Sequence, residues 1–174
     1  MARRIVAVTT ITPTATGDTA NLVDATYPFL LQGGSSSQLN YIWEVSITGQ
    51  APTTSSPTNM LLARDSTVAT GTNTNGSGQT DAAMSPFTAA LAAPALTGNS
   101  NATTKPQRSA TLHLLNCSLN AFGGSYFWRA NKIDECPSTF GNTDTGAQLG
   151  EVSLSAFTGG TPGAIGAHMI YESL

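Results

Sequence analysis

The chain has 174 residues, a formal net charge of −3 and only 10% charged residues, whereas an average soluble protein has roughly 25%. Hydrophobic residues make up 40%, and the length allows one domain over residues 1–174 to bury a core without metal or disulfide staples. The scarcity of Lys and Arg excludes the clustered positive charge that binds nucleic acid. We therefore expect a neutral surface of Thr, Ser, Asn, Gln and Gly, which tolerates a second copy nearby because like charges do not repel it.

The N-terminal residues predict a strand and no targeting segment. Period-two alternation over residues 3–12 favours a strand. The apolar run "IVAV" stops after four residues, which is too short for a signal peptide or a membrane span. Arg3 and Arg4 are the only adjacent basic pair, and two residues are too few for a genome-packaging arm. We expect synthesis in a cytoplasm and neither a membrane nor a nucleic-acid partner.

Residues 39–48 show the clearest alternation in the first half of the chain. Glu44 and Ser46 point to one face, and the predicted apolar face consists of Tyr41, Trp43, Val45 and Ile47. Shorter strands are expected at 26–32 and 59–69. Pro28 suits the first of these to a strand start or an edge, because proline cannot donate to a central ladder.

Four further strands are predicted in the second half of the chain. They cover residues 109–120, 125–133, 151–157 and 167–174. The first two flank the turn "AFGG" and are expected to form a hairpin. In the third, Glu151, Ser153 and Ser155 are expected on a solvated face. In the last, Met169 and Tyr171 share a face.

Eight or so predicted strands and no long helical pattern indicate the fold class. The best helical candidate is a weak one at 85–94, of one or two turns. The sequence predicts an all-β, single-domain antiparallel β-sandwich or barrel of jelly-roll type. One long irregular excursion is expected at about 70–106, and excursions of this length are usually functional or disordered.

The excursion carries only two charges, at Asp81 and Lys105. Its Gly- and Asn-rich ends, such as "GTNTNGSGQT", are interpreted as hinges, and its middle contains apolar side chains that can pack against something. The predicted partner contacts are Met84, Phe87, Leu91 and Leu96.

No motif in the sequence predicts catalysis, a cofactor or a metal site. The only histidines are His113 and His168, both in predicted strands. His113 is expected to be a partly buried structural residue on the face of Cys117, but four positions along a strand span roughly 13 Å, beyond hydrogen-bond reach. Asp134 and Glu135, the only adjacent acidic pair, belong to a predicted turn and do not resemble a glycosidase pair.

The two cysteines match no zinc-ligand spacing. Cys117 and Cys136 are expected to be free thiols, with a single bridge left open if the protein works outside a reducing compartment.

The two tryptophans are expected in the core. Trp43 and Trp128 alternate with polar neighbours, which is typical of core-facing residues. If Trp128 and Tyr126 instead lay on an exposed sheet face, we would expect their rings to be able to stack on a glycan.

In overall style, the segments "SYFWRANK" and "GEVSLSAFTGGTPGAIGAHMIYESL", with the compact N-terminal opening, resemble small virion proteins of tailed bacteriophages that decorate or cement a capsid. The resemblance implies a β-rich, often trimeric protein that clamps neighbouring capsid subunits, and it assigns no contact residue.

The expected function is that of a non-enzymatic virion protein, made in the host cytoplasm, whose partners are the major capsid protein or other virion subunits and copies of itself, with a trimer favoured. One alternative is a self-assembling coat, tail-tube or pilus-like subunit. Another is a carbohydrate-binding β-sandwich module.

Overall fold

The computed structural model describes residues 29–53, 57–71, 96–97, 102–143, 149–156 and 164–174. The strand predicted at 3–12 and the short helix predicted at 85–94 lie outside these residues.

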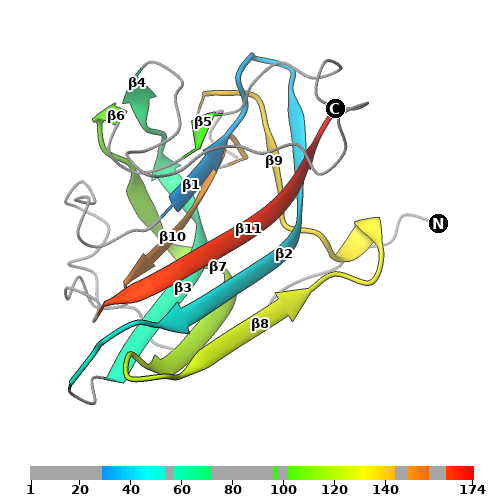
Figure 1. Ribbon diagram of the computed structural model, residues 1–174. Coiled ribbons are helices and arrows are strands. Elements are labelled where there is room, and N and C mark those ends of the chain that lie inside the picture. Colours follow the sequence, from blue (N-terminus) through cyan, green and yellow to red (C-terminus); the bar gives the residue numbers. More distant parts are fainter. Residues whose placement is uncertain (1–28, 54–56, 72–95, 98–101, 144–148, 157–163) are drawn as a thin grey trace.

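The described residues form two antiparallel sheets and a small two-stranded ribbon (Figure 1). The first sheet has the order β5 (Leu96–Thr97), β1 (Phe29–Gln32), β10 (Glu151–Ala156), β3 (Pro57–Thr67) and β7 (Gln107–Asn120). The second has the order β11 (Ile165–Ser173), β2 (Leu39–Gly49) and β8 (Ser125–Arg129), and β9 (Ser138–Phe140) also pairs with β2. The ribbon joins β4 (Thr70–Gly71) and β6 (Ala102–Thr104). This architecture confirms the predicted all-β sandwich.

The core lies between the two sheets, and Figure 1 shows the second sheet in front of the first. In the first sheet, Leu62 of β3 pairs with Leu154 of β10 on one side and with Leu115 of β7 on the other. Val45 and Ile47 of β2 are fully buried in the same cluster. Each such side chain contributes roughly 1.5–3 kcal/mol through removal from water.

Several partly buried residues of the second sheet pack against this cluster. They include Tyr126, Trp128, Met169 and Tyr171. The core position predicted for Trp128 is therefore confirmed, as is the shared inward face of Met169 and Tyr171.

The strands on either side of the turn 121–124 do not pair with each other, so the predicted hairpin is wrong. β7 pairs with β3, whereas β8 pairs with β2. The turn residues instead bond to the end of β2: the Gly49 N–H donates to Gly124 O at 2.7 Å and the Ala51 N–H donates to Ala121 O at 2.8 Å. Gly123 adopts φ +81°, a conformation that glycine takes without steric cost. The turn thus carries the chain from one sheet to the other.

A β-bulge in β2 removes Trp43 from the predicted apolar face. Glu44 pairs with Ile170, but the next pair joins Ile42 to Tyr171, so Trp43 is an extra residue on β2. A bulge of this kind shifts the alternation by one position. Ile42 takes the core place, and the Trp43 indole Nε1–H donates to the exposed Glu172 Oε2 at 3.0 Å.

β10 is buried on both of its faces. All six of its residues are buried, so the solvated face predicted for Glu151, Ser153 and Ser155 is wrong. Val152 and Leu154 face the core between the sheets, and the three polar residues occupy the opposite face of the first sheet. Strand burial on both faces is typical of a central strand.

Three short strands lie within the excursion predicted at 70–106. They are β4, β5 and β6, of which β4 pairs with β6 and β5 extends the first sheet by pairing with β1. Backbone pairing therefore joins β5 to the first sheet, whereas β4 and β6 pair with each other. The described residues contain no helix that is long and apolar enough to cross a membrane.

Candidate functional site

Of the four predicted contact residues, the structure describes one. Leu96 lies in β5, where its backbone pairs with Gln32 of β1. Met84, Phe87 and Leu91 lie outside the described residues. Their predicted role in partner contacts stays a prediction.

The histidine and the buried cysteine of β7 do not form a nucleophilic pair. Leu115 pairs with Leu62, but His113 pairs with Ala63, so a bulge in β7 turns His113 away from the face of Cys117. The predicted burial of His113 is confirmed at 7% exposure, whereas its predicted face is wrong. Burial raises the pKa of the Cys117 thiol to about 12, which leaves it protonated at neutral pH.

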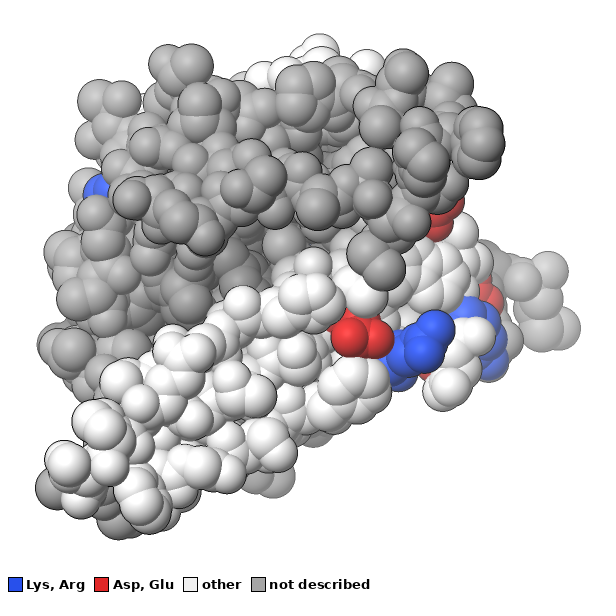
Figure 2. Space-filling view, viewed as in Figure 1, with Lys and Arg blue, Asp and Glu red and all other residues white. Residues whose placement is uncertain are grey.

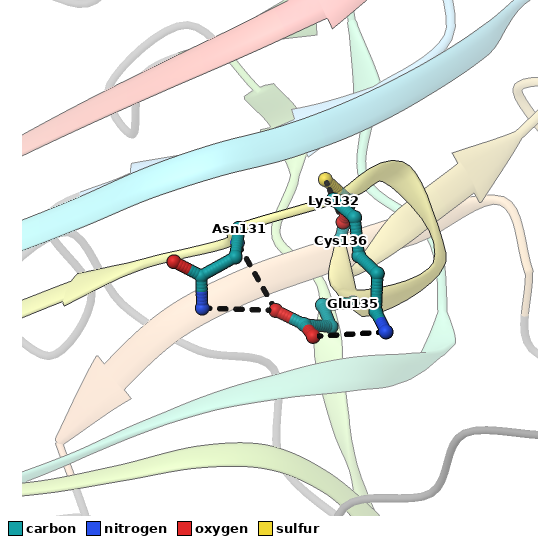
Figure 3. A network of polar contacts seen from close by, with 4 residues as sticks. All are labelled: Asn131, Lys132, Glu135 and Cys136. Carbon is teal, nitrogen blue, oxygen red and sulfur yellow. Dashed lines mark hydrogen bonds and ion pairs between the residues drawn. The ribbon is translucent and has the colours of Figure 1, made fainter.

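In the turn after β8, Glu135 of the acidic pair has local polar partners (Figure 3). Residues Ile133–Glu135 form a single 3-10 turn. The Glu135 carboxylate accepts the Asn131 backbone N–H at 3.0 Å and lies 3.7 Å from Lys132 Nζ. The Asn131 hydrogen bond, followed by the charge of Lys132, lowers the pKa of Glu135. The predicted turn is confirmed.

Cys136 ends this turn and is a free thiol, as is Cys117, so the prediction of free cysteines is confirmed. Partial burial and the nearby carboxylates of Glu172 and Glu135 raise the pKa of Cys136. Such a thiol is a weak nucleophile. Within the described residues, no group of three His, Cys, Asp or Glu side chains is placed to hold a metal ion.

The outer face of the second sheet is the candidate contact surface. Cross-strand partners share a face, so this face carries Phe127 beside Ser46 and His168, and Glu44 between Arg129 and Ile170. The same face continues toward the start of β2 through Tyr41, which pairs with Glu172.

An exposed apolar patch lies at the start of β2. We call it the terminal patch, and it consists of Leu39, Phe140 and Leu174. Leu39 pairs with Phe140 on one side and exchanges two backbone hydrogen bonds with Leu174 on the other, at 3.2 and 2.8 Å. The side chains of Phe140 and Leu174 are 47% and 64% exposed. Contact sites in proteins often contain exposed apolar side chains that lie next to each other.

On the described part of the outer face, charged side chains gather in one region. Figure 2 shows Lys, Arg, Asp and Glu atoms near the end of β8 and the turn after it, whereas the described surface toward the start of β8 is uncharged. The charged residues there include Arg129, Lys132 and Glu172. His168 Nδ1 lies 3.8 Å from Glu44 Oε1 on the same face.

A buried polar cluster on the far side of the first sheet was missed by the sequence predictions. It consists of Asp65, Arg108, Glu151, Ser153 and Ser155, none of which exceeds 1% exposure. Arg108 Nη1 donates to Ser155 Oγ at 2.9 Å and to Ala156 O at 2.8 Å. The Ser153 hydroxyl donates to Asp65 Oδ1 at 2.7 Å. Spacing alone gave no signal for this cluster, because its members come from β3, β7 and β10.

Burial dominates the electrostatics of this cluster. Loss of water raises the pKa of Asp65 to about 7, against the opposing effects of hydrogen bonds from Glu151 and Ser153 and of the Arg108 charge. Loss of water and the neighbouring Asp65 raise the pKa of Glu151 well above its usual range. The side chains have no solvent-exposed surface through which a substrate could reach them.

Comparison with known proteins gives no relative: no family model, no curated protein and no solved structure matches this chain.

Proposed function

We propose that this protein is a non-enzymatic structural protein of a virion, a capsid decoration or cement protein that works as a closed oligomer and stabilises the shell through protein-protein contacts. The observation that carries the proposal is the terminal patch on an otherwise neutral, mostly uncharged sandwich surface. The occupant proposed for this patch is a second copy of the chain.

Three features of the described surface support self-association. Phe140 and Leu174 expose apolar area, and burying that area against a second copy is favourable because it removes the area from water. The low charge removes the like-charge repulsion that keeps most soluble proteins apart. The charged residues near the end of β8 are available to orient a partner, since charge complementarity contributes more to orientation than to affinity.

Among the described residues, the groups with raised pKa values are not placed to act on a substrate. The carboxyl groups with raised pKa values are buried, and the Cys117 thiol stays protonated at neutral pH. The glycan-binding alternative needed Trp128 and Tyr126 on an exposed face, but both rings pack against the core. This placement removes the support for that platform.

The first test is the solution mass of the purified chain, measured by light scattering over a concentration series. A fixed small multiple of 17.9 kDa, with three favoured, is expected for a closed oligomer. Growth that continues with concentration would instead favour the coat, tail-tube or pilus-like alternative. A monomer at all concentrations would contradict both.

The second test addresses the virion itself. Quantitative mass spectrometry of virus particles purified from the culture that makes this chain is expected to find it in a fixed ratio to the major capsid protein. Particles that lack the chain would overturn the decoration role even if the purified protein is a trimer.

A further inference from the structure

The buried cluster on the first sheet holds one cationic group and two carboxyl groups. Arg108 supplies the positive charge, and Asp65 and Glu151 supply the carboxyls, all at 1% exposure or less. If both carboxyls were ionised, the cluster would hold an excess negative charge away from water, which is strongly unfavourable. One retained proton balances it.

The hydrogen bonds indicate where that proton lies. Asp65 Oδ1 accepts the Ser153 hydroxyl, but Asp65 Oδ2 is buried and receives no N–H or O–H from the described residues. Glu151 lies opposite Asp65, one position beyond the last β3–β10 pair of Val152 with Arg64, and a hydrogen bond from its carboxyl would supply the donor that Asp65 Oδ2 lacks. Two ionised carboxylates are both acceptors, so such a bond exists only while one of them is protonated.

Glu151 also reaches the chain that leaves the first sheet. Its two carboxyl oxygens accept the Ala69 backbone N–H at 3.2 and 3.0 Å. Ala69 directly precedes β4, and Thr70 of β4 pairs with Thr104 of β6. On the return path, Gln107 O accepts the Ser66 hydroxyl at 3.1 Å, and the next residue is Arg108. The cluster therefore lies at the base of the β4–β6 ribbon.

We propose that Asp65 and Glu151 share one proton, donated by Glu151, and that this proton clamps the base of the β4–β6 ribbon to the first sheet, so that raising the pH loosens the ribbon. With the proton, the side chains extend the β3–β10 ladder beyond its last pair, Val152 with Arg64. Without it, two buried carboxylates repel each other, and we expect this repulsion to outweigh the Ala69 N–H bond, which by itself favours the ionised form of Glu151.

Among the described neighbours of the pair, Arg108 is the permanent cation that faces it. From β7, Arg108 faces Asp65, and His113 lies opposite Ala63, two positions away along β3. From β1, the residue opposite Glu151 is the uncharged Gln32. Arg64 is directed elsewhere, because its Nη1 donates to Ser138 O at 2.8 Å.

Burial of Asp65 and Glu151 also determines in which direction pH affects the proton that they share. Loss of water raises the pKa of Asp65 to about 7 and, together with the charge of Asp65, raises that of Glu151 well above its usual range. The clamp is therefore complete in acid and is lost as the pH rises through the folded-state values. This inference concerns the isolated chain and does not depend on the proposed role in a virion.

The test is amide hydrogen exchange of the purified protein at about pH 6 and about pH 8.5, corrected for the intrinsic pH dependence of exchange. In the wild type, peptides that cover Ser66–Gly71 and 102–108 are expected to exchange about tenfold faster at the higher pH, the change that corresponds to one pKa unit of linkage. An unchanged corrected rate in these peptides would overturn the proposal.

Glu151→Gln is the decisive variant. Its amide donates to Asp65 and accepts from Ala69 at every pH, so the corrected exchange rates are expected to differ by less than about twofold between the two conditions. Asp134→Asn, which removes an exposed carboxylate in the turn after β8, is the matched control and is expected to keep the wild-type response. A Glu151→Gln protein that keeps the full wild-type response would contradict the shared proton.

If Glu151→Gln does not fold, infrared difference spectroscopy of the wild type decides the question. A carbonyl band of a protonated carboxylic acid is expected to persist at neutral pH and to disappear in alkali. Its absence at neutral pH would overturn the proposal.

Discussion

The outer faces of the two sheets differ in what covers them. On the first sheet, Glu151, Ser153 and Ser155 are fully buried together with Asp65 and Arg108. On the second sheet, Phe127, Phe140 and Leu174 are between 47% and 64% exposed. Polar groups are thus enclosed on one side of the sandwich and apolar groups face water on the other.

This difference indicates that the first face contributes to stability and the second to association. Buried polar groups stabilise only when every member has its partner, so the first sheet depends on a complete hydrogen-bond network. Exposed aromatic side chains contribute little to folding and are available to a partner. Substitutions on the first face should therefore affect stability, and substitutions on the second should affect association.

The largest effect on stability is expected for Arg108→Met. The variant leaves the Asp65–Glu151 pair without its buried cation and Ser155 without its donor, which should lower the free energy of unfolding by about 3–5 kcal/mol. Urea unfolding followed by tryptophan fluorescence measures the loss. Arg129→Met, on the exposed face, should change stability by no more than about 0.5 kcal/mol. Equal losses of stability in the two variants would contradict the claim that the buried face of the first sheet contributes more to stability than the exposed face of the second.

The buried carboxyl groups of the first sheet should also make the stability of the protein depend on pH. Because burial raises the pKa of Asp65 to about 7 and raises that of Glu151, the folded state holds protons that the unfolded state releases. The free energy of unfolding should be lower at about pH 8.5 than at about pH 5.5, by at least about 1.4 kcal/mol, equivalent to one pKa unit. Urea titrations at both pH values test this, and stability that rises with pH would refute it.

A smaller loss is expected at the turn that connects the two sheets. Gly123→Ala places a side chain at φ +81°, while its Cβ would meet no atom within 4 Å. The cost is therefore conformational alone, about 1 kcal/mol. Ser125→Ala, two residues further on and exposed, should be nearly neutral by the same thermal unfolding measurement. An unchanged stability of the Gly123→Ala variant would show that the turn between the two sheets does not require the observed backbone conformation.

The sequence predicted the sandwich and most of its strands, because period-two alternation marks strands such as 39–48 and 109–120 directly. It also placed Trp128, Met169 and Tyr171 correctly against the core. Alternation tells which residues share a face but not what covers that face, and for this reason Glu151, Ser153 and Ser155 were expected in water.

The remaining errors come from bulges and sheet changes. A single extra residue in β2 moved Trp43 off its predicted face, and another in β7 did the same for His113. The turn after Asn120 has the residues of a hairpin, yet β8 pairs with β2, which lies far away in the sequence. The terminal patch could not be predicted either, since it brings together Leu39, Phe140 and Leu174 from three separate parts of the chain.

Self-association through the terminal patch can be tested by light scattering of two single variants at equal concentration. Phe140→Asp places a charge in the terminal patch, and Phe122→Asp places one in the turn near the other end of β2, about 33 Å away by the strand rise; Phe122 is 55% exposed. Both should fold with stability within about 0.5 kcal/mol of the wild type. We expect Phe140→Asp to be monomeric and Phe122→Asp to keep the wild-type oligomer. A Phe140→Asp protein that keeps the wild-type mass would contradict the claim that this face joins the copies.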